Sequence, residues 1–307
     1  MPLTLTLTYR PRLRLHRDTR EPWQVLHAEA TDLERELETL WLSVFLDFRS
    51  ALDASTLALA LQHGALPTEH ALWSAWHGVT QEQTRLPLLS LLQGSAERIT
   101  DALTPGLQQL LEAPGLRFDV PTPDMSAFIE RYVGQELVGV TDTTRAQVRQ
   151  IVRQAVESGQ THRQAAKELR EVVGLTPRQT SAVEALRQRL TDEGRSDRYI
   201  TSQVELAADR GIRLRAQQVA RTESMSVANA AQQQLNEQAQ EGGWLPPDQK
   251  RQWLVTPDSR LCEICAPIPG MNPGGVALDE PFQTPDGPLD MPPRHPNCRC
   301  TLTLVMA

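Results

Sequence analysis

The sequence predicts a mainly α-helical protein, in which a multi-helical body precedes a small C-terminal β-hairpin/loop module clipped by a Cys/His cluster. Two observations predict this fold class. Apolar residues recur at three- and four-residue steps over much of the first 240 positions, which is the period of an amphipathic helix. All four cysteines lie between positions 262 and 300, in a stretch rich in proline and glycine. We therefore expect three regions, at residues 1–120, 121–243 and 244–307.

The first region is expected to be helical after an initial strand. Residues 3–9, "LTLTLTY", alternate apolar side chains with threonine, as a half-buried strand does. Its partner is expected to be a distant segment, such as "TLTLV" at 301–305, or a strand of another protein. From Glu21 to about Leu111 the pattern is helical, with shorter segments near 68–79, 83–94 and 96–112. The apolar face of the first helix comprises Leu33, Leu37, Leu40, Trp41, Val44 and Phe45.

The second region is expected to be a succession of short helices joined by tight turns. "EAPGLRFDVPTPD" at 112–124 has the composition of a linker. A helix is then predicted at 140–159, with a Thr/Asp cap and Gly159 as its stop. "THRQAAKELREVVG" and "LTPRQTSAVEALRQRLTDEG" repeat this design, and "DRYITSQVELAADRG" continues it. A longer helix is predicted at 213–240, ended by Gly242 and Gly243.

Two sets of polar residues on these helices are candidates for contacts. Arg145, Arg149 and Arg153 follow one another at four-residue steps, so they share one helix face. Such a stripe is a solvated surface or a site for a partner or a phosphate group. The other set lies among Ala, Val and Met, where hydrogen bonds between helices are a better interpretation than catalysis. It comprises Arg221, Glu223 and Asn229.

Composition and charge describe a folded protein without strong affinity for nucleic acid as a whole. The net charge of −7 disfavours general binding to phosphate backbones. Residues 141–221 nevertheless carry 15 Lys/Arg against 10 Asp/Glu, a balance of +5. No apolar run approaches the roughly 20 residues of a membrane helix, so no membrane partner is expected. The N-terminus lacks the pattern of an export signal, which predicts synthesis in a reducing cytoplasm.

The cysteines have the spacing of metal ligands. Cys262 and Cys265 form a C-x2-C knuckle, whose two thiolates can both reach a tetrahedral zinc ion. The second ligand pair is ambiguous, because His295 and Cys298 have the same spacing whereas Cys298 and Cys300 are separated by one residue. On an extended strand Cys298 and Cys300 would point the same way. Four cysteines, or three cysteines with a histidine, therefore both remain possible.

The segment around the cysteines also favours a structural clip. "RQWLVT" at 251–256 and "TLTLV" at 301–305 are predicted to pair as antiparallel strands. Between the cysteine pairs, 13 of the 32 residues at 266–297 are Pro or Gly, so the ends of this loop need fixing. Structural Zn²⁺ is the preferred interpretation, ahead of two disulfides or reduced thiols, and a catalytic site is the least favoured. Asp258 and Arg260 either orient the ligands or cap the turn.

Several stretches resemble the phage Mu F-like minor head proteins, also called the phage head morphogenesis family. The resemblance runs from about residue 125 to the C-terminus and is most specific in its last two pieces. The pieces are "YVGQELVGVTDTTRAQVRQIVRQAVESGQTHRQAAKEL", "GLTPRQTSAV", "VARTESMSVANAA", "KRQWLVTPDSRLCEICAPIPG" and "PPRHPNCRCTLTLV". Residues 281–293 make the inter-cysteine loop irregular, residues 1–120 match no motif, and no toxin or enzyme domain follows the motif.

The resemblance implies a non-enzymatic virion protein that assembles in the host cytoplasm and then resides in the capsid interior or at the portal vertex. Its implied partners are the portal protein, the major capsid protein and, for some members of the family, packaged DNA. Two other hypotheses compete with this one. A zinc-stabilised nucleic-acid-binding module would use the basic middle region, and a Cys/His-dependent hydrolase would use the cysteine cluster.

Overall fold

The computed structural model describes residues 20–51, 84–118, 122–157, 161–256 and 263–305, together with residues 58, 62 and 78–79. The expected strand at 3–9 lies outside the described residues, as do Cys262, Asp258 and Arg260, and of the helical segment expected at 68–79 only residues 78–79 are described.

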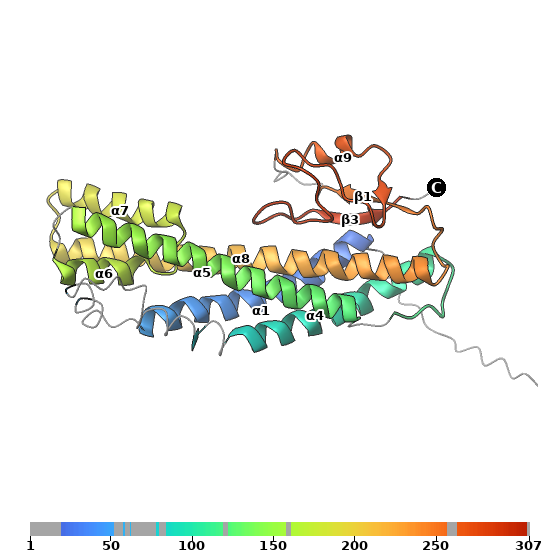
Figure 1. Ribbon diagram of the computed structural model, residues 1–307, viewed down its shortest axis with the longest axis horizontal. Coiled ribbons are helices and arrows are strands. Elements are labelled where there is room, and N and C mark those ends of the chain that lie inside the picture. Colours follow the sequence, from blue (N-terminus) through green and yellow to red (C-terminus); the bar gives the residue numbers. More distant parts are fainter. Residues whose placement is uncertain are drawn as a thin grey trace, which may run out of the picture.

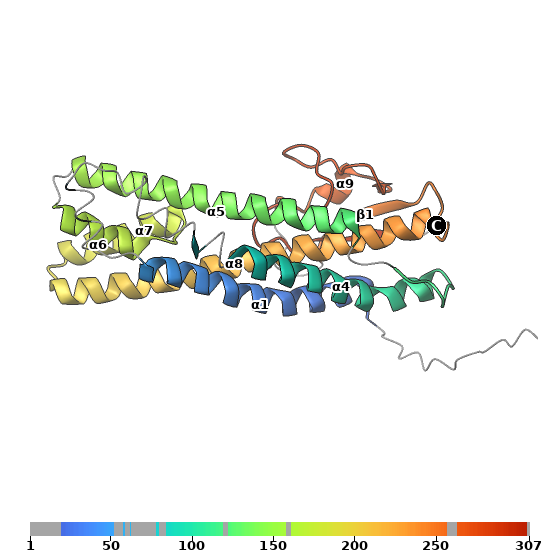
Figure 2. The same ribbon diagram turned by 60° about the horizontal axis from the view of Figure 1, so that its bottom comes forward.

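Four long helices form an elongated body, with two shorter helices at one end (Figure 1). The long helices are α1 (Pro22–Ala51), α4 (Arg85–Leu110), α5 (Pro123–Glu157) and α8 (Asp197–Glu241). The shorter pair is α6 (His162–Val172) and α7 (Pro177–Asp192). A small C-terminal module lies beside the C-terminal half of α8 (Figure 2). The predicted fold class is therefore confirmed.

The apolar face of α1 lies in the core of this body. Leu33, Leu37, Trp41 and Phe45 are all fully buried. The prediction of two separate segments at 83–94 and 96–112 is wrong. A single helix, α4, runs through both, with Pro105 inside it. One continuous set of buried residues joins α1, α4 and α8, so regions 1–120 and 121–243 share a core. The boundary at residue 120 stays a prediction.

Helix α5 begins earlier than expected, which corrects the predicted start and cap near residue 140. Thr122 is the N-terminal cap, since its hydroxyl accepts a hydrogen bond from the Met125 amide at 3.0 Å. The expected Thr/Asp cap lies inside the helix, where the neighbouring Thr143 and Thr144 hydroxyls donate to carbonyls four residues earlier. Threonine in a helix interior makes such bonds, so these residues do not mark a helix start.

Helices α6 and α7 begin where the sequence predicts. Thr161 and Thr176 each form a capping box with a glutamine three residues later. Gly174 and Gly194 follow the two helices with φ of 90° and 69°, the left-handed conformation that glycine adopts without steric cost.

Helix α8 is one helix of 45 residues, which corrects the predicted break near Gly211. Glycine occurs here because another segment packs too closely for a side chain. A Cβ at Gly211 would lie 2.6 Å from Leu175 Cδ2, in the turn between α6 and α7. The Gln179 side chain also donates to the Gly211 carbonyl at 2.9 Å. The predicted end is observed, since Gly242 caps the helix and Gly243 has φ of 73°.

The C-terminal module contains a three-stranded sheet and a short helix, α9 (Ile268–Met271). Strand β1 (Lys250–Leu254) pairs antiparallel with β3 (Thr301–Leu304), as predicted, and Trp253 lies opposite Leu302. Strand β2 (Val276–Ala277), which the sequence analysis missed, pairs with the other edge of β1. The strand order is therefore β2-β1-β3.

The Pro/Gly-rich loop of the module has internal anchors besides the cysteines. The Asn272 side chain donates to the Gln283 carbonyl at 2.9 Å and accepts from the Gln283 amide at 2.8 Å. Phe282 is fully buried and meets Trp253 edge-on, with ring centroids 5.5 Å apart. The Arg251 guanidinium donates to the Glu280 carbonyl at 3.0 Å. A second small core thus also holds the loop, in addition to the cysteine cluster that the sequence predicts at its ends.

Candidate metal centre

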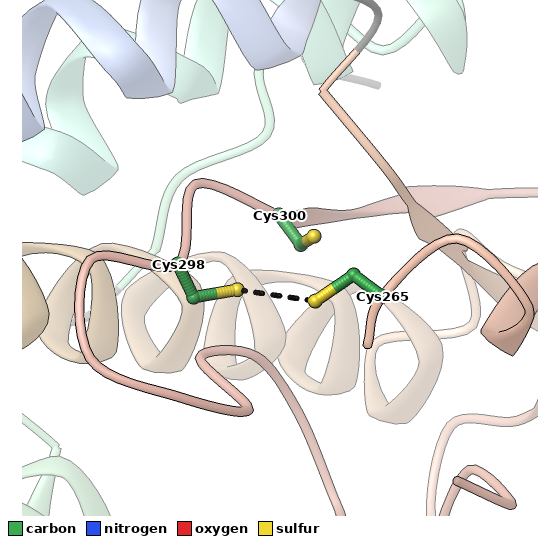
Figure 3. Close-up of side chains that lie close together, drawn as sticks. All are labelled: Cys265, Cys298 and Cys300. Carbon is green, nitrogen blue, oxygen red and sulfur yellow. Dashed lines mark hydrogen bonds between the residues drawn. The ribbon is translucent and has the colours of Figure 1, made fainter. Parts of the chain in front are cut away.

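Three cysteine side chains converge in the C-terminal module (Figure 3). Cys298 and Cys300 lie on the chain that enters β3, and Cys265 precedes α9. Their exposed fractions are only 1% to 4%. These three side chains therefore lie inside the second core and are almost entirely shielded from solvent.

The sulfur positions fit a tetrahedral metal site. The three Sγ atoms lie within 4.8 Å of one another, and those of Cys265 and Cys298 are 3.8 Å apart. Zinc–sulfur bonds of about 2.3 Å at tetrahedral angles place two sulfurs about 3.8 Å apart. A disulfide needs about 2.05 Å between its sulfurs, so Cys265 and Cys298 are too far apart to be bonded to each other. The cluster can bind a metal ion, and its chemistry and spacing suit zinc.

His295 lies beside this cluster in an orientation that suits a ligand. Its Nε2 is 3.2 Å from Cys265 Sγ, and its Nδ1 is 2.8 Å from the Pro296 carbonyl oxygen. Metal-binding histidines commonly donate their other ring N–H to such a carbonyl. His295 is nevertheless outside the group of three sulfurs that lie within 4.8 Å of one another. Cys262 lies outside the described residues, so the fourth ligand remains either Cys262 or His295.

Hydrogen bonds among the buried thiols shift their pKa values in opposite directions. Hydrogen bonds from Cys265 and Cys300 lower the pKa of Cys298 well below its usual value. The same contact with Cys298 raises the pKa of Cys265, and burial raises it further. A single thiolate supported by two thiols is thus the favoured arrangement of the protein groups alone. Several thiolates in one buried site require a cation among them.

The helical body holds the backbone between the two C-terminal cysteines. The Arg299 carbonyl oxygen lies 2.9 Å from His27 Nε2 of α1 and accepts from the Thr256 hydroxyl at 2.5 Å. The Asn229 amide of α8 donates to the Cys300 carbonyl at 3.2 Å and to the Met225 carbonyl at 2.8 Å. Two helices therefore position the cysteine segment. His27 was missed from the sequence, because no spacing relates it to a segment 272 residues away.

The other candidate polar residues of α8 contact α1 and lie apart from the cysteines. The Arg221 guanidinium makes contacts of 2.7 Å and 3.1 Å with the Glu34 carboxylate. Trp41 donates to Glu223 Oε2 at 2.6 Å. Both contacts are interhelical, which is the kind of contact that the sequence predicts for these residues.

The arginine stripe lies on α5, in its C-terminal half. The side chains of Arg145, Arg149 and Arg153 are outside the described part of the structure. Their assignment to a partner or a phosphate group stays a prediction.

The fold and the site define a helical protein whose small C-terminal module carries a buried, metal-type cysteine cluster. The model of the family "Phage Mu protein F like protein" matches residues 146–303, just over half of the chain. The chain therefore belongs to this family, whose members are phage head proteins. No curated protein and no solved structure gives a significant match. Among the described helices, none is long and apolar enough to cross a membrane.

Proposed function

We propose that this chain is a minor capsid protein of a tailed bacteriophage that binds the portal vertex and the major capsid protein and assists head assembly. The observation that carries the proposal is the family match, which spans the helical residues 146–241 and the cysteine module together. In this role the protein resides first in the host cytoplasm and then in the virion. Assistance to DNA packaging or delivery is part of the proposal, through the basic middle region.

The architecture supports a structural role. Four long helices share one core and give the body an elongated shape (Figure 1). Cys265, Cys298 and Cys300 are buried within the module, so a macromolecular substrate cannot reach their sulfurs without opening it. These features favour a protein that presents fixed surfaces to other capsid components over a Cys/His-dependent hydrolase.

Zinc would serve this role as a structural clip. Cys265, Cys298 and Cys300 would hold it, with Cys262 or His295 as the fourth ligand. Bound zinc would supply a positive charge that keeps several thiolates stable in a buried site. The protein groups orient that site through His27 and Asn229, which fix the backbone on either side of Cys300.

The test of portal binding is the copy number of this protein in procapsids assembled with and without the portal protein. Quantitative mass spectrometry against the major capsid protein measures it. We expect the copy number to fall to background without portal, while the major capsid protein assembles in both samples. An undiminished copy number without portal would contradict the proposal.

A further inference from the structure

A pocket of about 600 Å³ lies between the helical body and the C-terminal module. The beginning of α7 forms one side and the middle of α8 another. The third side comes from Asn297 and Arg299, on either side of Cys298. Three segments that are distant in sequence thus meet around one hollow, separate from the cysteine cluster.

The charge of this pocket is positive. Arg178 of α7, Arg221 of α8 and Arg299 each line it, and none of the described residues that line it is acidic. The chain as a whole carries −7. Three guanidinium groups border one hollow on an acidic protein, and although Glu34 neutralises the charge of Arg221, the hollow favours an anionic ligand.

The ion pair of Arg221 shows that a carboxylate can bind to an arginine at the edge of the pocket. It already holds the Glu34 carboxylate through both Nε and Nη2, at distances of 2.7 Å to 3.1 Å. The planar guanidinium matches a carboxylate in this two-point manner. Arg178 makes no ion pair with another described residue, so its charge is available to a ligand.

The remaining lining favours a peptide over a nucleic-acid backbone. Leu214 is 60% exposed and provides an apolar surface inside the arginine set. Gln217, Gln218 and Asn297 provide side-chain amides, which can both donate to and accept from peptide groups. A sugar-phosphate strand offers no apolar side chain for Leu214. A volume of about 600 Å³ accommodates a few residues of an extended segment.

We propose that this arginine pocket, defined by Arg178, Arg221, Arg299 and Leu214, binds a short peptide segment of a partner protein. The segment carries an Asp or Glu carboxylate next to an apolar side chain. Its carboxylate pairs with Arg178, and its apolar side chain packs on Leu214. The inference rests on the lining residues alone and does not require binding to the portal.

The experiment measures binding of labelled peptides to the full-length protein by fluorescence anisotropy. The probe is a short peptide that alternates Leu with Asp and Glu, and its matched control carries Asn and Gln instead. We expect the acidic peptide to bind roughly tenfold or more tightly than its amide counterpart. Arg178→Glu should weaken binding of the acidic peptide by a similar factor. Arg178 is exposed in the first turn of α7, where a glutamate is compatible with the helix.

Arg189→Glu is the matched control, because Arg189 lies exposed near the end of the same helix and outside the pocket. It should leave the affinity for the acidic peptide unchanged. Circular dichroism of both variants checks that they remain folded. Equal binding of acidic and amide peptides, or unchanged binding to Arg178→Glu, would overturn the proposal. So would displacement of the acidic peptide by oligothymidine at lower concentration, which would identify a phosphate site.

Discussion

The indole N–H of Trp41 donates a hydrogen bond of 2.6 Å to the Glu223 carboxylate, and both side chains are at most 1% exposed. Trp41 belongs to α1 and Glu223 to α8, so the bond joins two helices through residues that are 182 positions apart in sequence. A carboxylate without partners is costly in such a core. The bond therefore ties the N-terminal helix to the family-matched part of the chain.

The first prediction concerns this bond. Trp41→Phe keeps an aromatic ring but removes the donor, and should destabilise the protein by about 1–3 kcal/mol. A double-mutant cycle with Glu223→Gln, measured by urea unfolding, should give a coupling energy of about 1 kcal/mol or more. Trp23→Phe, at a partly exposed position of the same helix, is the control and should have a smaller effect. Additive effects at Trp41 and Glu223 would show that the bond contributes little.

Gly211 provides a second prediction, in which helix propensity and packing oppose each other. Gly211→Ala adds a methyl group 2.6 Å from the fully buried Leu175 and should destabilise by about 1–3 kcal/mol. At Gly94 of α4 the nearest atom to an added Cβ is 3.9 Å away, on Arg98. Gly94→Ala should therefore stabilise the protein by up to about 1 kcal/mol. Thermal and urea unfolding measure both, and stabilisation by Gly211→Ala would refute the packing argument.

Arg215 provides a third prediction. It is 4% exposed, donates to the carbonyls of Gly174 and Leu175 at 2.9 Å and 3.0 Å, and lies 4.8 Å from the Phe45 ring centroid. Burial lowers its pKa to about 10. Arg215→Lys keeps the charge but loses the planar fork, and should cost about 2 kcal/mol or more. Arg213→Lys, at an exposed position, should be nearly neutral. Equal unfolding midpoints for the two variants would contradict this account.

The fourth prediction concerns pH. Burial raises the pKa of Glu171 above 4.5, although Arg187 and Lys167 partly oppose the shift. The folded state then binds this proton more tightly than the unfolded state. The stabilisation that protonated Glu171 contributes is therefore complete below a pH of about 4.5. It is lost as the pH rises through the folded-state pKa of this carboxyl group.

Glu171→Gln cannot titrate, so it provides the comparison for this group. The unfolding free energy of the unsubstituted protein minus that of the variant should fall as the pH rises from 4.5 towards neutrality. Urea unfolding at a series of pH values gives both quantities. A difference that grows with pH would mean that the ion pair with Arg187 outweighs burial.

The fifth prediction concerns the metal. Protein purified without chelator should contain about one zinc per chain, measured by mass spectrometry, because the site fits one tetrahedral ion. Removing the metal should change the fluorescence of Trp253, which packs in the same core as the cysteines. Absence of metal together with a loss of titratable thiols would indicate disulfides instead.

A variant of Asn229, which holds the backbone at Cys300, extends this test. Asn229→Ala removes the donor to the Cys300 carbonyl, so it should speed metal release to a chromogenic chelator without lowering the zinc content. Gln252→Ala, at an exposed position on β1, is the control and should leave the release rate unchanged. Identical rates for both variants would remove Asn229 from the supporting role.

The sequence predicted correctly those helix starts that depend on residues only a few positions apart. Thr161 and Thr176 begin α6 and α7 because their capping boxes involve residues only three positions away. The pairing of β1 with β3 was predictable because both segments are short, contain strand-forming residues and lie next in sequence to the two cysteine pairs. The clustering of Cys265 with Cys298 followed from ligand spacing alone.

Long-range packing determines what the sequence did not show. Gly211 has the local signature of a helix end, yet its role depends on Leu175 in another segment. His27 contacts the cysteine segment although nothing in its own neighbourhood marks it. The internal anchors of the proline-rich loop, such as Asn272, depend on hydrogen bonds that no periodic pattern encodes.

The continuity of α8 has a mechanical consequence. A helix of 45 residues is about 68 Å long. Gly211 packs against the turn before α7, and Asn229 and Gln233 bond to the cysteine module, so one rod couples both sites. Gly211 and Asn229 are 18 residues, or about 27 Å, apart along this helix, so a tilt of about 5° about Gly211 moves Asn229 by about 2 Å. Force applied at the α6 and α7 end is thus delivered to the cysteine module as displacement, without an intervening hinge.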